Sequence, residues 1–359
     1  MFAMFIILLV VFVTAICGFY SYKYVISAPK AQSKGASIDI DPAKGVAVEI
    51  PLNSNTTSIA GLLKEKGLIK YPYIFKILSK LNGFDGMYQS GTHIVDNDPD
   101  RDKLSRIIES YDRLMRILAS KPESIKVTIP EGYTYRQITD TLSKKKLIDV
   151  DKFDRTANTE KFNYKFLEDL PKRENRLEGY LFPDTYEFDP KAGEKAIINA
   201  MLENFENKLK PEYYQRAKEL NMSIDQIIIL ASIIEREAKY AEERKIISGV
   251  FYNRLRSKDP AMKKLQSCAT IQYIFFKRDG IIKEKISEQD TKVKDPYNTY
   301  IIDGLPPGPI CSPGRSSIEA ALYPEKTDYM FFVAKGDGYH QFSKTLKEHQ
   351  AATKKYGGN

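Results

Sequence analysis

The first 22 residues of the chain contain no charged side chain, and this run constrains the fold more than any other feature of the sequence. Residues 1–20 are apolar almost throughout, and a helix of about 20 such residues spans the hydrocarbon core of a bilayer. Tyr20, Tyr22 and Tyr24 stand where aromatic side chains lie at a membrane interface. We therefore predict a single-pass membrane protein with a transmembrane helix over residues 1–25.

Two other interpretations of this run stay open. A cleaved secretory signal usually has a basic start and a shorter apolar stretch, and this sequence has neither. A lipid on Cys17 needs a small preceding residue, whereas Ile16 is bulky. Charge alone does not fix the orientation, because Lys23 and Lys30 follow the run and the positive-inside rule would place that end in the cytoplasm.

The formal net charge of +8 suits contact with anionic surroundings such as phospholipid headgroups or acidic polymers. The chain has no C2H2 zinc-finger spacing and no RRM signature, so we predict no nucleic-acid binding. Three cysteines and three histidines occur without a CxxC or HExxH motif, so we predict no metal and no cofactor. Cys268 and Cys311 either form a disulfide in an oxidising compartment or pack as separate thiols.

Two segments of the chain align with each other by eye. VEIPLNSNTTSIAGLLKEKGLI begins at Val48 and VTIPEGYTYRQITDTLSKKKLI begins at Val127. Each contains a strand, a proline turn, a helix and a Leu-Ile exit, which indicates a duplicated small α+β module. After a linker over 26–45, we predict one module over 46–125 and a second module or connector over 126–190. The modules either bind and position a polymer or only pack and space the chain.

The remaining residues, 191–359, have a mainly helical pattern and are predicted to form one α+β domain. Its best-defined helix is predicted over 223–239, because Ser223 and Gln226 form a capping-box signature. The run IIILASII that follows is apolar on all sides, which is typical of a buried helix. We expect this helix to lie in the core of the domain.

Glu235 ends that apolar run and is the candidate catalytic residue. A general acid has to hold a proton near neutral pH, and partial burial of a carboxyl group favours its neutral form. The alternative is that Glu235 only begins the exposed face of the helix. Glu237 lies about 200° further round the helix and is not expected to share the site. Asp184, in EGYLFPDTYEF, is the other acid in an unusual setting.

Four segments have the composition of site loops, because tyrosines, amides and hydroxyls suit sugar stacking and hydrogen bonding. They are Glu178–Phe188, Leu265–Tyr273, Tyr297–Gly314 and Phe332–His349. His340, in the last of them, either bonds the substrate, orients Glu235 or is structural.

In their order along the chain, EGYLFPDTYEF, ASIIEREA, FYNRL, LQSCATIQY, YNTYIIDGLPPGPICSPG and YHQFSKTLKEH closely resemble the endolytic murein transglycosylase family, also called YceG-like or MltG. The resemblance covers nearly the whole chain. It implies an α+β fold with an N-terminal transmembrane helix, a LysM-like small α+β module and a mainly helical α+β catalytic domain. One departure is visible, because many relatives carry Asp-Pro where this chain has Cys268-Ala269.

The resemblance also implies the function. The family's catalytic glutamate falls on Glu235, and the enzyme cleaves the MurNAc-GlcNAc bond within peptidoglycan strands to leave 1,6-anhydroMurNAc ends. It implies a catalytic domain outside the cytoplasm, an anchor in the cytoplasmic membrane and cell-wall synthases (penicillin-binding proteins) as partners. The candidate substrate-binding residues are Asp184, Tyr186, Asn253, Gln266, Tyr297, Asn298, Tyr300 and His340.

Two rival functions remain at this point. A glycan hydrolase would use Asp184 as a second carboxylate and would leave ordinary reducing ends. A membrane-tethered peptidoglycan-binding scaffold, built on the duplicated module, would bind strands without cleaving them.

Overall fold

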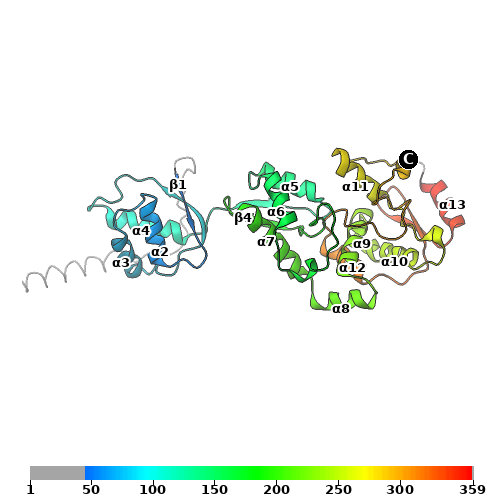
Figure 1. The fold of residues 1–359 in the computed structure, drawn as a ribbon, viewed down its shortest axis with the longest axis horizontal. Helices are drawn as coiled ribbons and strands as arrows, with labels where there is room; N and C mark the ends of the chain where they lie inside the picture. The colour runs from blue at the N-terminus through cyan, green and yellow to red at the C-terminus, as the bar shows by residue number, and fades with distance from the viewer. Residues whose placement is uncertain (1–44, 358–359) are drawn as a thin grey trace, which may run out of the picture. The chain divides into compact units, whose positions relative to one another are not determined.

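The computed structural model describes residues 45–357. Within this range, helices combine with three two-stranded antiparallel sheets, which confirms the predicted α+β class. The chain divides into two compact units between Ser124 and Ile125 (Figure 1). No helix in the described range is long and apolar enough to cross a membrane. The predicted anchor over 1–25 and nearly all of the predicted linker lie outside that range.

The first unit is built on one strand pair with helices packed against it. Its elements are β1 (Gly45–Ile50), α2 (Thr56–Glu65), α3 (Pro72–Leu81), β2 (Gly91–Asp96) and α4 (Ile107–Ala119). β1 pairs antiparallel with β2, and the buried core includes Val48, Leu63, Phe75, Val95, Tyr111 and Leu118. α4 begins at Ile107. The preceding residues form turns around buried Arg101, which donates a hydrogen bond to Asp96 at 3.0 Å.

The second unit begins with β3 (Ile125–Thr128), α5 (Tyr135–Lys144), α6 (Val150–Thr159), η1 (Lys165–Leu167), β4 (Thr185–Phe188), α7 (Gly193–Lys208), α8 (Pro211–Glu219) and α9 (Ile224–Glu237). It continues with η2 (Ala241–Glu243), α10 (Arg244–Leu255), η3 (Pro260–Met262), α11 (Cys268–Asp279), η4 (Asp290–Lys292), α12 (Arg315–Leu322), β5 (Phe331–Ala334), β6 (His340–Ser343) and α13 (Leu346–Tyr356). β3 pairs antiparallel with β4, and β5 pairs antiparallel with β6.

The two aligned segments have matching local structure. β1–α2–α3–β2 and β3–α5–α6–β4 run in the same order, apart from the short η1 turn, and each ends on an antiparallel strand pair. The aligned residues Asn55 and Thr134 both cap a helix N-terminus through their side chains. The aligned residues Asn53 and Gly132 both have left-handed backbone, with φ of 61° and 79°. A LysM-like identity for either segment stays a prediction.

One hydrophobic core runs through the second unit. It includes Val127 of β3 and Leu322 of α12, so the predicted module over 126–190 and the predicted domain over 191–359 share it. α9 lies against α8, α10, α11 and α12 (Figure 1), and Ile227–Ile234 are buried. The predicted capping box at Ser223 and Gln226 is confirmed, because each side chain bonds the other residue's backbone N–H.

Two segments predicted to be site loops are partly regular structure. Leu265–Tyr273 runs into α11, which buries Ile271 and Ile274 against the core. Phe332–His349 contains most of the β5–β6 hairpin and the start of α13. Leu265 and Ile271 of the first segment lie in the core, and Phe332 and Phe342 of the second pack against it.

Candidate active site

Glu235 lies in the last turn of α9, and its side chain is only 7% exposed. The Arg244 guanidinium donates from Nη2 to Oε1 at 3.2 Å. The backbone N–H of Gly314, just before α12, donates to Oε2 at 2.9 Å. Arg244 is itself oriented by the hydroxyl of Ser317, 3.0 Å from its Nε. The Glu235 carboxyl is thus held in place by two hydrogen-bond donors.

A second carboxyl group, that of Glu131, also lies beside Gly314. Glu131 is in the turn between β3 and α5, and a carbon atom added to Gly314 would overlap its carboxyl group. Burial, and after it the negative charge of Glu235, raise the pKa of the Glu131 carboxyl, while Arg244 lowers it. Sequence reasoning did not find Glu131 or Arg244 as site residues, whereas Gly314 is the last residue of the predicted site loop Tyr297–Gly314.

The duplication carried a signal for Glu131. In the two aligned segments Glu131 occupies the position of Leu52, directly after the proline that ends the strand. Leu52 is 78% exposed. The fold therefore does not need an acidic residue at this position. The presence of Glu131 there indicates a role other than packing.

The other carboxyl group at the end of α9 has different partners. The hydroxyl of Ser267 donates to the Glu237 carboxyl, and burial raises the pKa of that carboxyl. His340 and Tyr300 are both within electrostatic range of Glu237. Two of the predicted substrate-binding residues therefore lie at this end of α9, on the Glu237 side.

The imidazole of His340 is held in place by its neighbours. Its Nδ1 lies 2.8 Å from Oε2 of Glu243, and its ring packs edge-on against Phe332. The Tyr300 hydroxyl lies 3.0 Å from the thiol of Cys268. Both described cysteine thiols are free, and Cys311 is buried, with its Sγ 3.3 Å from the carbonyl of Ser232.

Three more predicted residues support the loop around Tyr297. Asn298 is fully buried and donates to the carbonyls of Thr291 and Val293. The ring of Tyr297 packs against Tyr273, and burial raises the pKa of Tyr297 to about 12. Gln266 has left-handed backbone and accepts a hydrogen bond from Arg254.

Asp184 and Tyr186 contact α7. The Asp184 carboxylate accepts from Asn204 at 3.0 Å and lies 3.4 Å from Lys208 Nζ, and the bond from Asn204 lowers the pKa of that carboxyl. The buried Tyr186 hydroxyl donates to the carbonyl of Phe182.

Asn253 joins α10 to the segment before β5, because its amide donates to the carbonyls of Thr327 at 2.7 Å and Tyr329 at 2.9 Å. We expect Asn253→Ala to lower the free energy of unfolding by about 2 kcal/mol, since two acceptors lose their donor. Urea denaturation measures this, with the exposed Asn158→Ala as the matched control. Unchanged stability with a raised KM would instead indicate a substrate contact.

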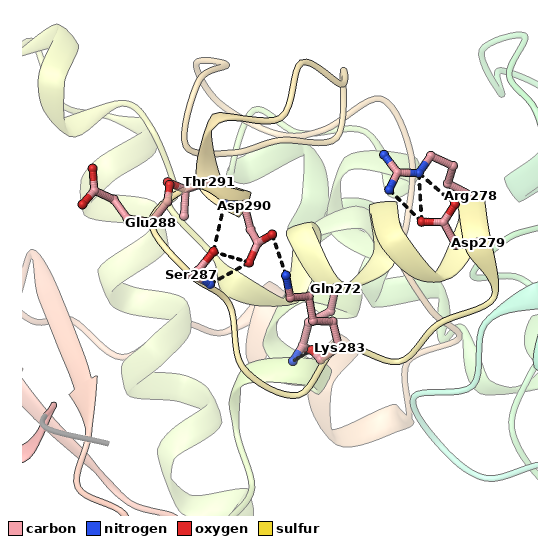
Figure 2. Close-up of polar contacts among 8 residues, drawn as sticks. All are labelled: Gln272, Arg278, Asp279, Lys283, Ser287, Glu288, Asp290 and Thr291. Carbon is pink, nitrogen blue, oxygen red and sulfur yellow. Dashed lines mark hydrogen bonds and ion pairs between the residues drawn. The ribbon is translucent and has the colours of Figure 1, made fainter.

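A small hollow of about 60 Å³ lies beside Arg236, the neighbour of Glu235 in the chain. Its lining includes Thr134, Gln137, Gln272, Phe276, Ile282 and Ile310. The segment that carries Ile282 is fixed, as Figure 2 shows: Lys283 Nζ and the hydroxyl of Ser287 both lie 2.6 Å from the Asp290 carboxylate. The hydrogen bonds from Lys283 and then from Ser287 lower the pKa of the Asp290 carboxyl to about 2.

The site is thus a glutamate at the end of a core helix, hydrogen-bonded by Arg244 and Gly314, in a unit that follows a smaller α+β unit in the chain. The chain belongs to the YceG-like family, whose model matches residues 48–355. This confirms the resemblance drawn from the sequence motifs.

Relatives and a solved structure agree with this assignment. The chain is 34% identical over 337 residues to an endolytic murein transglycosylase of Bacillus subtilis, covering 89% of this chain and 87% of that protein. It is 31% identical to an endolytic murein transglycosylase of Streptococcus pneumoniae, covering 88% of this chain and 58% of that protein. The crystal structure of a yceG-like protein from Listeria monocytogenes is 31% identical, with a TM-score of 0.53, and covers 86% of this chain and 99% of that one.

Proposed function

We propose that this protein is an endolytic peptidoglycan lytic transglycosylase with Glu235 as its acid and base. The observation that carries the proposal is the Glu235 carboxyl, buried at the end of the core helix and fixed by Arg244 and Gly314. The names of the relatives, which match over nearly 90% of this chain, support the substrate class.

In the proposed reaction, protonated Glu235 donates its proton to the glycosidic oxygen between MurNAc and GlcNAc. The carboxylate that results takes the proton of the MurNAc 6-hydroxyl, whose oxygen attacks C1. The C1–O bond to the leaving sugar breaks, a 1,6-anhydro ring forms, and no water is consumed. Arg244 and the Gly314 N–H stabilise the carboxylate between the two proton transfers.

The proposal also covers the residues that contact the substrate and the location of the enzyme in the cell. Tyr300 and His340, on the Glu237 side of α9, and the hollow beside Arg236 would contact sugar units on the two sides of Glu235. Residues 1–25 would anchor the protein in the cytoplasmic membrane, with the second unit outside the cytoplasm. There it would help terminate nascent strands beside cell-wall synthases.

The nature of the strand ends tests the proposal. The full chain in detergent is incubated with polymeric peptidoglycan, and the fragment ends are read by mass spectrometry, with Glu235→Gln in parallel. We expect 1,6-anhydroMurNAc ends that the variant does not produce. Reducing ends would overturn the lytic mechanism in favour of a hydrolase, and intact strands with bound protein would favour the scaffold.

A further inference from the structure

Helix α3 of the first unit has apolar side chains on two opposite sides. One side faces the core and buries Phe75 and Leu78. On the other side, Tyr73, Ile77 and Leu81 are 73%, 44% and 45% exposed. Residues four apart lie on the same side of a helix, so these three side chains form one exposed stripe along α3.

Two lysines lie on the same exposed side of α3. Lys76 follows Tyr73 by three residues and Lys80 follows Ile77 by three, so the members of each pair are neighbours on the helix surface. α3 contains no acidic residue, and neither lysine forms an ion pair with any of residues 45–357. We call Tyr73, Lys76, Ile77, Lys80 and Leu81 the α3 face, which is both apolar and positively charged.

The second copy of the strand–helix pattern has no such face. α6 follows α5 in the chain as α3 follows α2. The exposed side chains of α6 are all polar or charged: Asp151, Lys152, Arg155, Asn158 and Thr159. The fold therefore does not need exposed apolar residues on this helix, and apolar side chains grouped on a surface indicate an interaction site.

The sequence before the first unit and the charge of the α3 face indicate a lipid surface as the partner. Residues 1–25 are the proposed membrane anchor, and residues 26–44 can span at most about 65 Å when fully extended. An anchored chain therefore keeps the first unit close to the bilayer. At a bilayer surface, tyrosine rings lie at the level of the headgroups, apolar side chains enter the acyl boundary and lysines reach the phosphates.

We propose that the α3 face docks on the phospholipid surface of the membrane that holds the anchor, with Lys76 and Lys80 against anionic headgroups. The inference rests on the membrane anchor of the proposed function. An amphipathic helix binds a membrane surface through its buried apolar area together with attraction to anionic lipids, and the α3 face supplies both. Docking fixes the orientation of the first unit on the bilayer, which a tether alone does not.

A fluorescent reporter on the α3 face tests this, because the chain contains no tryptophan and Tyr73→Trp introduces a single one. The full chain is reconstituted into vesicles of phosphatidylglycerol and phosphatidylcholine that carry a spin-labelled lipid. We expect the emission to shift to shorter wavelength and to be quenched, more strongly than in vesicles of phosphatidylcholine alone. Lys76→Gln and Lys80→Gln, each added to Tyr73→Trp, should lower the ratio of docked to free protein about fivefold. Tyr323→Trp, at an exposed tyrosine of the second unit, is the matched control and should stay unquenched.

Flotation of the vesicles separates a failure of the docking from a failure of the anchor. A chain that floats with the vesicles while the reporter stays unquenched would overturn the docking and leave the anchor intact. A chain that does not float would overturn the anchor and the docking with it. A shift of the emission that grows with protein concentration, without quenching by lipid, would overturn the docking in favour of a second copy of the chain on this face. Absence of strand cleavage in a chain that docks would overturn only the proposed reaction.

Discussion

Glu235→Gln is expected to lower the rate of strand cleavage by about 10³-fold, since a general acid and base typically contributes about 10²–10⁴-fold. The amide has nearly the same shape, and its oxygen can still accept from Gly314 or Arg244. It can neither give up nor take the proton that the reaction moves. The fold should therefore survive, and the variant should still bind strands. Initial rates with polymeric peptidoglycan, together with a thermal melt, measure both expectations.

The cleavage rate of Glu237→Gln is the control for that of Glu235→Gln. It makes the same substitution two residues further along the same helix, at a carboxyl that is also buried but bonds Ser267. Its loss of rate should be much smaller, because this carboxyl is not bonded to Arg244 or Gly314. Equal losses in the two variants would contradict the assignment of the proton transfers to Glu235.

Glu178→Gln is expected to remove a large pH dependence from the stability of the second unit. Glu178 is 2% exposed, accepts from the N–H of Tyr135 at 2.8 Å, and lies 3.2 Å from the Tyr273 hydroxyl. Burial raises the pKa of this carboxyl from 4.5 to about 8. The folded chain therefore holds this proton at pH values where the unfolded chain has lost it.

The sign of the effect follows from that difference. Below about pH 4.5 the folded and the unfolded chain both carry the Glu178 proton, and this carboxyl costs no free energy of unfolding. As the pH rises from 4.5 to about 8, folding has to take up a proton, and the wild type loses about 4 kcal/mol. Glutamine resembles the protonated acid and cannot ionise. The free energy of unfolding of Glu178→Gln should therefore lack this decrease between pH 4.5 and 8. Urea denaturation at pH 5, 6.5 and 8 measures both proteins. Parallel curves for the two would refute the prediction, and Glu203→Gln, at an exposed carboxylate of α7, should follow the wild type.

Local signals explain which parts of the fold were predictable. The capping box at Ser223 and the apolar run after it placed α9 correctly, because both signals lie within one helix. The similarity of the segments at Val48 and Val127 predicted two copies of one strand–helix pattern, and their caps and left-handed residues coincide.

The sequence by itself determined the family and the α+β class, and it predicted Glu235 as the catalytic residue, since ordered motifs and helix periodicity are carried by neighbouring residues. Only the tertiary structure decided what surrounds Glu235. Gly314 lies 79 residues away in the chain, and Glu131 reaches the site because two backbone hydrogen bonds hold its turn against the segment before α12. Charges and donors act over a few ångströms of space, whatever their separation in sequence, so the electrostatics of the site exist only once the chain has folded.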